Sequence, residues 1–362
     1  MKIAIIGAGL SGLACAITLE KHGYFVDIFE KRGMVGDRFV VAETMSSMLH
    51  IPIDDGVKYF SEEHDIHLKP SSNIRKMYVY SPNESACFEG HLGSINMRGK
   101  HPHSYEKQLE AQLHTKIYFN EDVSYDDIAK EYTHIVLATG DPSYTQMLQS
   151  FDTAVKVSFK GALVKGNFEV TDIHTWHNHH YAPKGVSYFL PHCQTEGSLI
   201  IAYPQYPENE GVQKEELWKR FYDEACKKLG QNLHITETFS LNNFVIGKAR
   251  YPRIGNTFFT GNCLGVMTPF QGFGQLPSII SGIYAAHDLC GLGKYEELTK
   301  GLFQNYHDSL TLRRAIEQLS NDQLDLLTKA FRLEFVERAL VNHRINWFNV
   351  ASRIIHPFSR NS

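Results

Sequence analysis

Residues 2–30 read KIAIIGAGLSGLACAITLEKHGYFVDIFE, and this stretch decides the fold. The run KIAII at residues 2–6 is short, apolar and rich in β-branched side chains, which predicts a buried parallel strand. Residues 11–22 carry apolar side chains at helical spacing, and Gly23 is a suitable stop. A second strand is predicted at Tyr24–Glu30. The three segments together form one strand–helix–strand unit of an α/β sheet.

The turn between the first strand and the helix is GAGLSG at residues 7–12, a G-x-G-x-x-G pattern. Gly7 permits the tight turn, Gly9 lets the backbone approach a pyrophosphate, and Gly12 lets the helix pack closely on the strand. The first turn of the helix offers free N–H groups and a partial positive charge to phosphates. A dinucleotide is therefore predicted to contact Gly7, Gly9, Leu10, Ser11 and Gly12.

Glu30 ends the second predicted strand, and Lys31 follows it. An acidic side chain at this point accepts hydrogen bonds from an adenosine ribose. Its charge disfavours a 2′-phosphate, but it does not separate FAD from NAD.

Two later segments distinguish these cofactors. Residues 133–142, THIVLATGDP, predict a buried strand that ends near Gly140. Residues 257–286, TFFTGNCLGVMTPFQGFGQLPSIISGIYAA, predict a strand, a glycine-rich loop and a helix. A nicotinamide dehydrogenase needs one phosphate-binding turn, whereas the longer FAD needs a second glycine-rich loop near its flavin ring. The sequence therefore predicts FAD, with this second site far from the first.

With these motifs the chain resembles the flavoproteins with a glutathione-reductase-type Rossmann fold, in the branch of para-hydroxybenzoate hydroxylase and the geranylgeranyl reductases. The resemblance extends to about residue 290. The late segment matches the family pattern at Gly261, Gly265, Pro269, Gly272, Gly274, Ser281, Gly282, Ala285 and Ala286.

The resemblance implies several further cofactor contacts. Asn262 stands where the family has an aspartate that binds the ribityl chain, and an amide can still bond a hydroxyl. The backbone at Gly274 and Gln275 would face the pyrimidine edge of the flavin. Val123 matches the position whose backbone contacts adenine, and Arg38 stands where the family often has a basic residue near the cofactor.

Residues 183–191, PKGVSYFLP, resemble the substrate motif P-x-x-Y-x-W-x-F-P of the geranylgeranyl reductases. Both prolines remain, while Val186, Tyr188 and Leu190 replace the aromatic residues, which predicts an apolar strand that lines the substrate pocket. The resemblance implies hydride transfer from N5 of reduced flavin to a carbon–carbon double bond of an apolar, isoprenoid or lipid-like substrate. Tyr188 and Cys263 are candidate proton donors, with simple pocket lining as the alternative.

The order of elements predicts an α/β fold: a Rossmann-type FAD-binding domain, an inserted antiparallel β-sheet substrate domain and a C-terminal helical segment. Residues 31–100 are expected to be irregular, with mixed turns and short strands, and antiparallel sheet is expected over 153–205. The FAD-binding domain is assigned to residues 1–60, 94–150 and 250–293, the substrate domain to 61–93 and 151–249, and the helical region to 294–362.

Composition excludes other classes of function. With 36 Lys and Arg against 40 Asp and Glu, the formal net charge is −4, which is unlike the basic footprint of a nucleic-acid binder. The 6 cysteines contain no C-x-x-C pair, which favours a reducing, cytoplasmic compartment. The histidines of residues 174–180, HTWHNHH, are interpreted as surface side chains, so no metal site is predicted.

Several alternatives stay open. One is a flavin monooxygenase that hydroxylates an aromatic or polyketide-like substrate, and another is a non-catalytic flavin-binding protein. The electron donor is NAD(P)H or a small redox carrier, since no second G-x-G-x-x-G follows a strand. The tail over residues 331–355 mixes apolar and arginine side chains, which suits either packing on the substrate domain or peripheral membrane contact. The oligomeric state is left open.

Overall fold

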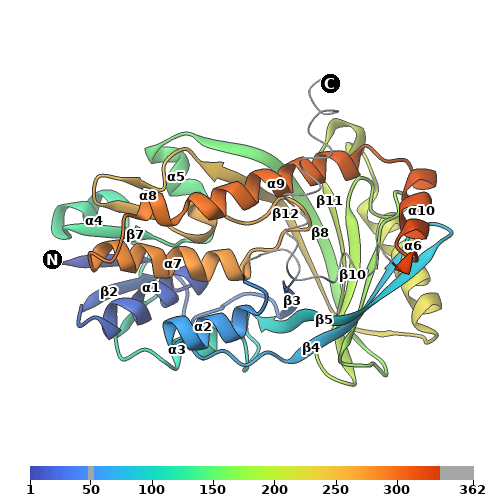
Figure 1. Cartoon of the computed structure of the whole chain (residues 1–362), viewed down its shortest axis with the longest axis horizontal. Coiled ribbons are helices and arrows are strands. Elements are labelled where there is room, and N and C mark those ends of the chain that lie inside the picture. Colours follow the sequence, from blue (N-terminus) through green and yellow to red (C-terminus); the bar gives the residue numbers. More distant parts are fainter. Residues whose placement is uncertain (48–52, 335–362) are drawn as a thin grey trace.

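The computed structural model describes residues 1–47 and 53–334, which fold around two β-sheets that lie side by side (Figure 1). The first sheet has 6 strands in the order β13–β14–β7–β1–β2–β6. Strand β1 pairs in parallel with β2 and β7, so the predicted strand–helix–strand unit is confirmed. The strands are β1 (Ile3–Ile6), β2 (Val26–Glu30), β6 (Ile117–Phe119), β7 (His134–Leu137), β13 (Arg253–Ile254) and β14 (Thr257–Phe259).

Two helices of this part pack against each other with almost no space between their backbones. They are α1 (Leu10–Lys21) and α7 (Gln275–Leu289). A Cβ on Gly282 of α7 would lie 2.0 Å from the carbonyl oxygen of Ser11 in α1. Only a glycine permits this approach. The smaller helices are α2 (Gly56–His64), α3 (Tyr105–Glu110), α4 (Tyr125–Glu131), α5 (Ser143–Leu148) and α8 (Tyr295–Leu298).

The second sheet has 8 strands in the order β12–β8–β11–β10–β9–β4–β5–β3. Neighbouring strands are antiparallel except for β4 and β9, which run in parallel. The antiparallel sheet predicted over 153–205 is confirmed at the β8, β11 and β10 pairings. The strands are β3 (Val41–Ser46), β4 (Ser72–Tyr80), β5 (Ser85–Arg98), β8 (Phe151–Lys165), β9 (Asp172–Trp176), β10 (Val186–Pro191), β11 (Glu196–Pro204) and β12 (His234–Ala249).

The expectation of turns and short strands in residues 31–100 is wrong for β4 and β5, which have 9 and 14 residues, and it misses α2. The sequence of β4, SNIRKMYVY, does not show the regular alternation of a strand, for two reasons. A register shift between Ile74 and Lys76 breaks its alternation. Both of its faces are also covered, so apolar side chains point in both directions.

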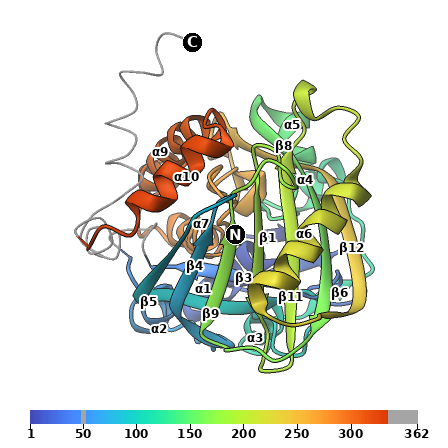
Figure 2. The same cartoon turned by 90° about the vertical axis from the view of Figure 1, so that its right-hand side faces the viewer.

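Helices cover both faces of the second sheet. In Figure 2, α6 (Lys214–Leu229) crosses the strands on one side, and its Trp218 and Phe221 pack with Trp176 and Phe189. On the other side lie α9 (Lys300–Glu317) and α10 (Asn321–Ala330), and α9 runs along the top of Figure 1 from the first sheet to the second. Since neighbouring side chains of a strand alternate, one face of this sheet packs on α6 and the other is free to line a cavity.

The domain boundaries drawn from the sequence stay a prediction. Strand β3 and the last residues of β5 belong to the eight-stranded sheet, although they fall within the ranges assigned to the FAD-binding domain. Most of the tail segment 331–355 lies outside the described residues. Within the described ranges, no helix has the length and apolar character needed to cross a bilayer.

Candidate functional site

The glycines of the first turn fall into two groups. A Cβ on Gly7, which has φ +107°, would lie 2.4 Å from the Ala138 carbonyl oxygen. A Cβ on Gly12 would lie 2.1 Å from the Gly7 carbonyl oxygen. Gly9 differs, because the nearest atom to its added Cβ is 3.9 Å away. Gly7 and Gly12 are therefore needed for packing, whereas Gly9 leaves open space in front of the backbone.

Two further glycines also face open space. Nothing lies within 4 Å of a Cβ built on Gly140, and the nearest atom to one on Gly272 is the Met267 sulfur at 4.0 Å. Gly9 and Gly140 follow β1 and β7, which are neighbours in the sheet. The crevice at the carboxyl ends of such parallel strands is where open α/β sheets bind ligands. An extended ligand can approach the backbone closely at these positions.

Two helix N-termini lack a side-chain cap. The residues before α1 and α7 are Gly9 and Gly274, and neither supplies a side-chain hydrogen bond to its helix. The first N–H groups of both helices therefore remain available to an anionic group, which the helix dipole favours. Leu10 and Ser11 lie in the first turn of α1 as predicted.

Glu30 joins the end of β2 to the glycine turn. Its Oε2 accepts a hydrogen bond of 2.9 Å from the Ala8 N–H, and its Oε1 accepts one of 3.0 Å from the Arg32 N–H. The carboxylate is partly exposed beside the turn, which suits the ribose role predicted for it. Lys31 is exposed.

The second glycine segment begins after β14, close to the first glycine turn. Gly261, directly after β14, packs on α1, since its added Cβ would lie 2.8 Å from Ser11 Oγ. Its N–H donates to Ser281 Oγ at 2.8 Å. The neighbouring Asn262 donates from Nδ2 to the Gly140 carbonyl oxygen at 3.0 Å. The pairing of β14 with β7 brings the end of β14 next to the first turn. The separation expected for the later loop with Gly272 and Gly274 stays a prediction.

Two other predicted residues have partners inside the protein. Cys263 is buried, its sulfur lies 3.1 Å from Thr139 Oγ1, and burial raises the pKa of its thiol. Its side chain does not line the cavity described next. The Val123 carbonyl oxygen accepts a hydrogen bond from the Tyr144 hydroxyl at 2.8 Å.

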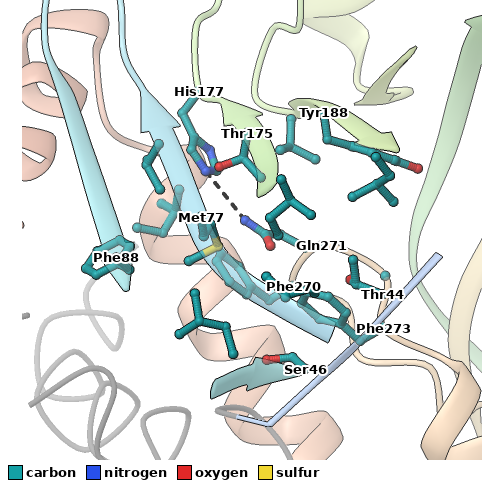
Figure 3. A pocket seen from close by; sticks show the side chains of 18 of the residues that line it. Thr44, Ser46, Met77, Phe88, Thr175, His177, Tyr188, Phe270, Gln271 and Phe273 are labelled. Carbon is teal, nitrogen blue, oxygen red and sulfur yellow. Dashed lines mark hydrogen bonds between the residues drawn. The ribbon is translucent and has the colours of Figure 1, made fainter. Parts of the chain in front are cut away.

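A largely apolar cavity of about 370 Å³ lies between the second sheet, the loop before α7 and the helices α9 and α10 (Figure 3). All three residues of the predicted pocket strand line it, namely Val186, Tyr188 and Leu190. The predicted cofactor residues Gly272 and Gly274 line it too, whereas Pro269 is buried just before them. The remaining lining residues include Ile74, Met77, Val79, Phe88, Leu92, Ile173, Phe270, Phe273, Leu312, Ile316, Leu324, Leu327 and Phe331.

Charged groups meet at the edge of the cavity in a network that the sequence did not reveal. Glu43 lines the cavity, and its carboxylate lies 2.6 Å from Arg98 and 3.4 Å from Arg38. Burial opposes ionisation of Glu43, but the two guanidinium groups outweigh it and lower the pKa of the carboxyl. Gln275, the first residue of α7, donates from Nε2 to Glu43 Oε2 at 3.2 Å. Arg38 therefore belongs to an internal network as well as lying near the predicted cofactor site.

The interpretation of the histidines in HTWHNHH as surface side chains is wrong for His177, which lines the cavity, and for His174, which stacks on Tyr78 and Trp176. His177 directly follows β9. Because side chains alternate along this strand, Thr175 and His177 face the cavity, whereas Trp176 packs on α6. His179 instead bonds the Leu319 carbonyl oxygen, and His180 is exposed. In the parts of the chain that the structure describes, no three potential ligands come together as a metal site.

Three buried histidines around the second sheet should make the folded protein less stable at acidic pH. Burial lowers the pKa of His174, His177 and His192 to about 4 each. Between this value and the ordinary pKa near 6.5, the unfolded chain binds more protons than the folded one. We expect the free energy of unfolding to have its full value above about pH 6.5. It should fall as the pH drops toward 4, by on the order of 1 kcal/mol per histidine and pH unit.

Urea unfolding at a series of pH values checks this expectation. His174→Gln should make the loss of stability with falling pH shallower, whereas His180→Gln, at an exposed site, should leave it unchanged. An equal slope in all three proteins would contradict the assignment to buried histidines.

Comparisons with known proteins agree with this geometry. Residues 5–69 match the model of an NAD(P)-binding Rossmann-like domain. A geranylgeranyl bacteriochlorophyll reductase-like protein from Thermoplasma acidophilum superposes with a TM-score of 0.72 at 14% identity, over 98% of this chain and 96% of that one. A flavin-dependent brominase superposes with a TM-score of 0.69 at 12% identity, over 100% of this chain and 99% of that one.

The chain has the fold of these two proteins. The predicted fold class, a Rossmann-like domain joined to a second sheet, is thereby confirmed. A stretch of 43 residues also matches a 4,4'-diapolycopen-4-al dehydrogenase from Metabacillus indicus at 51% identity. That match spans 12% of this chain and only 9% of the dehydrogenase.

Proposed function

We propose that the chain is an FAD-dependent oxidoreductase that reduces carbon–carbon double bonds of an apolar, isoprenoid or lipid-like substrate. The observation that carries the proposal is the apolar cavity, which reaches the glycine loop in front of α7. FAD bound in the crevice would supply a hydride from N5 of its reduced ring. In this proposal the loop would lie between the hydride donor and the substrate.

The chain's own residues suit the cofactor. The open backbone at Gly9 and the uncapped start of α1 would hold the pyrophosphate, with Glu30 on the adenosine ribose. Asn262 and Gly140, bonded to each other, lie at the ends of β14 and β7 on the way to the second loop. Gly272 and the uncapped N-terminus of α7 would face the flavin ring. Negative charge on a reduced flavin is favoured by such a helix N-terminus.

The cavity favours an apolar substrate, and Tyr188 is its candidate proton donor. Burial raises the pKa of the Tyr188 hydroxyl, so the group keeps its proton at neutral pH. Cys263 is the less suitable candidate, because its thiol is enclosed by Thr139 and the Asp141 carbonyl oxygen.

The electron donor in this proposal is NAD(P)H or a small redox carrier. The proposed location is cytoplasmic, and membrane contact through the C-terminal helices is an additional proposal.

A flavin monooxygenase is the second candidate. The rings of Phe88, Phe270 and Phe273 in the cavity wall also suit an aromatic substrate, which favours this alternative. The two reactions differ in what oxidises the reduced flavin. A reductase transfers electrons to the double bond, whereas a monooxygenase needs oxygen.

The absorbance spectrum of the purified protein, followed by anaerobic reduction, tests the proposal. We expect flavin bands that bleach on reduction and return when an unsaturated isoprenoid such as farnesol is added without oxygen. Return of the bands only with oxygen and an aromatic substrate would favour the monooxygenase. A protein that takes up no added FAD would refute both.

A further inference from the structure

One part of the cavity wall is polar in a way that the apolar lining does not require. The ring of His177 and the side chain of Gln271 meet there, with their Nε2 atoms 3.5 Å apart (Figure 3). The amide nitrogen of Gln271 can only donate, so His177 Nε2 accepts and the ring carries its proton on Nδ1. This pair presents hydrogen-bonding groups to a space surrounded by apolar side chains.

Both residues are held firmly in place. The His177 N–H donates to the Tyr80 carbonyl oxygen at 2.8 Å, which continues the pairing of β9 with β4. Gln271 has φ +56°, a left-handed conformation that is unfavourable for a non-glycine residue. Its loop is fixed at Pro269, whose carbonyl oxygen accepts a hydrogen bond of 2.8 Å from Arg313. Such a backbone persists at functional sites when the surroundings enforce it.

The pair also separates two cavities. A smaller one of about 70 Å³ shares His177, Gln271 and Tyr188 with the main cavity and is lined by Lys184 and Arg313. These cations already have partners, since Lys184 pairs with Glu208 at 3.1 Å and Arg313 pairs with Glu317. The described lining of the main cavity contains no lysine or arginine, and it includes the anionic Glu43. A carboxylate or phosphate would lose its hydration there without gaining a free cation.

Resting on the proposed function, we infer that His177 determines substrate specificity: with Gln271 it binds one uncharged hydroxyl or carbonyl group of a substrate that is otherwise apolar. Burial lowers the pKa of His177 to about 4, so the imidazole is neutral at physiological pH. Because its Nε2 accepts from Gln271, the Nδ1 proton of His177 and the amide oxygen of Gln271 are the donor and the acceptor left for a substrate. A neutral pair of this kind matches an alcohol, aldehyde or ketone. A site built to bond such a group discriminates against an analogue that lacks it.

Calorimetric titration of the FAD-loaded protein with three ligands of one carbon skeleton tests this inference. The ligands are the hydrocarbon farnesene, the alcohol farnesol and farnesoic acid, measured at pH 7.5. We expect farnesol to bind about tenfold more tightly than farnesene, as one net hydrogen bond allows, and more tightly than farnesoic acid. His177→Phe should keep the affinity for farnesene and remove the preference for farnesol. Gln271→Asn, which suits the left-handed backbone but shortens the reach of the amide, should reduce the preference in part.

Leu190→Met is the matched control, because it changes the shape of the same cavity without changing its polarity. It should alter all three affinities alike. The inference is overturned if farnesoic acid binds most tightly, if none of the ligands binds, or if His177→Phe retains the preference for farnesol. Failure of the proposed function shows separately, as a protein that holds no FAD or as a bound isoprenoid that does not reoxidise the reduced flavin.

Discussion

Replacing Gly9 by alanine is expected to weaken FAD binding by roughly 100-fold or more, about 2.8 kcal/mol, while the fold remains intact. The backbone of Gly9 has φ −89°, which alanine adopts without strain, and the nearest atom to the new methyl group is 3.9 Å away. The methyl group would instead occupy the space in which a pyrophosphate approaches the turn. Titration of FAD into deflavinated protein measures the affinity, and thermal unfolding of the same protein measures the fold.

Two matched substitutions separate the possible causes. Gly301→Ala, in α9 with nothing within 4 Å of the added Cβ, should change neither FAD affinity nor folding appreciably. Gly12→Ala should destabilise the apoprotein itself by about 1–3 kcal/mol or more, because its Cβ would meet the Gly7 carbonyl oxygen at 2.1 Å. If Gly9→Ala bound FAD as tightly as the unmodified chain, the placement of the pyrophosphate on this turn would be wrong.

Replacing Arg98 by alanine is expected to lower the free energy of unfolding by about 3–5 kcal/mol. Arg98 is 12% exposed, and its guanidinium lies 2.9 Å from Glu106, which is 4% exposed. The same guanidinium bonds Glu43 at 2.6 Å. Removing it would leave two carboxylates close together with Arg38 as their remaining cation. Burial of an unbalanced charge costs much more than the pair itself contributes.

Urea unfolding of Arg98→Ala measures this loss. The control is Lys76→Ala, which removes an exposed pair with Glu89 from the same sheet and should leave the midpoint nearly unchanged. Since Glu43 also bonds Gln275 at the start of α7, the Arg98 variant should further loosen the flavin site. Equal midpoints for the two variants would show that the buried network adds little to stability.

The Rossmann part was predictable because its signals are local. The β-branched strand at residues 2–6 and the glycine spacing of residues 7–12 are recognisable within one short stretch of sequence, although Gly7 is required by a contact with the distant Ala138. The alternation of Val186, Tyr188 and Leu190 was likewise enough to predict that these side chains share a face.

The cavity itself was not predictable, because segments distant in the chain build its wall. Glu43 comes from β3, His177 follows β9, and Gln271 lies in the loop before α7. No spacing rule relates these positions. His177 was misjudged because its neighbours His179 and His180 do point elsewhere, and only the alternation beyond β9 distinguishes it.

The parallel pairing of β4 with β9 has a consequence for synthesis on the ribosome. Strands β3, β5 and β4 are complete once Arg98 has been made, but the outer edge of β4 must wait for Asp172–Trp176. During this interval the nascent chain carries an open strand edge with the aromatic side chains Tyr78 and Tyr80 beside it. Open edges of this kind pair with other chains. We therefore expect the early sheet to be prone to pairing with other chains until β9 has been made.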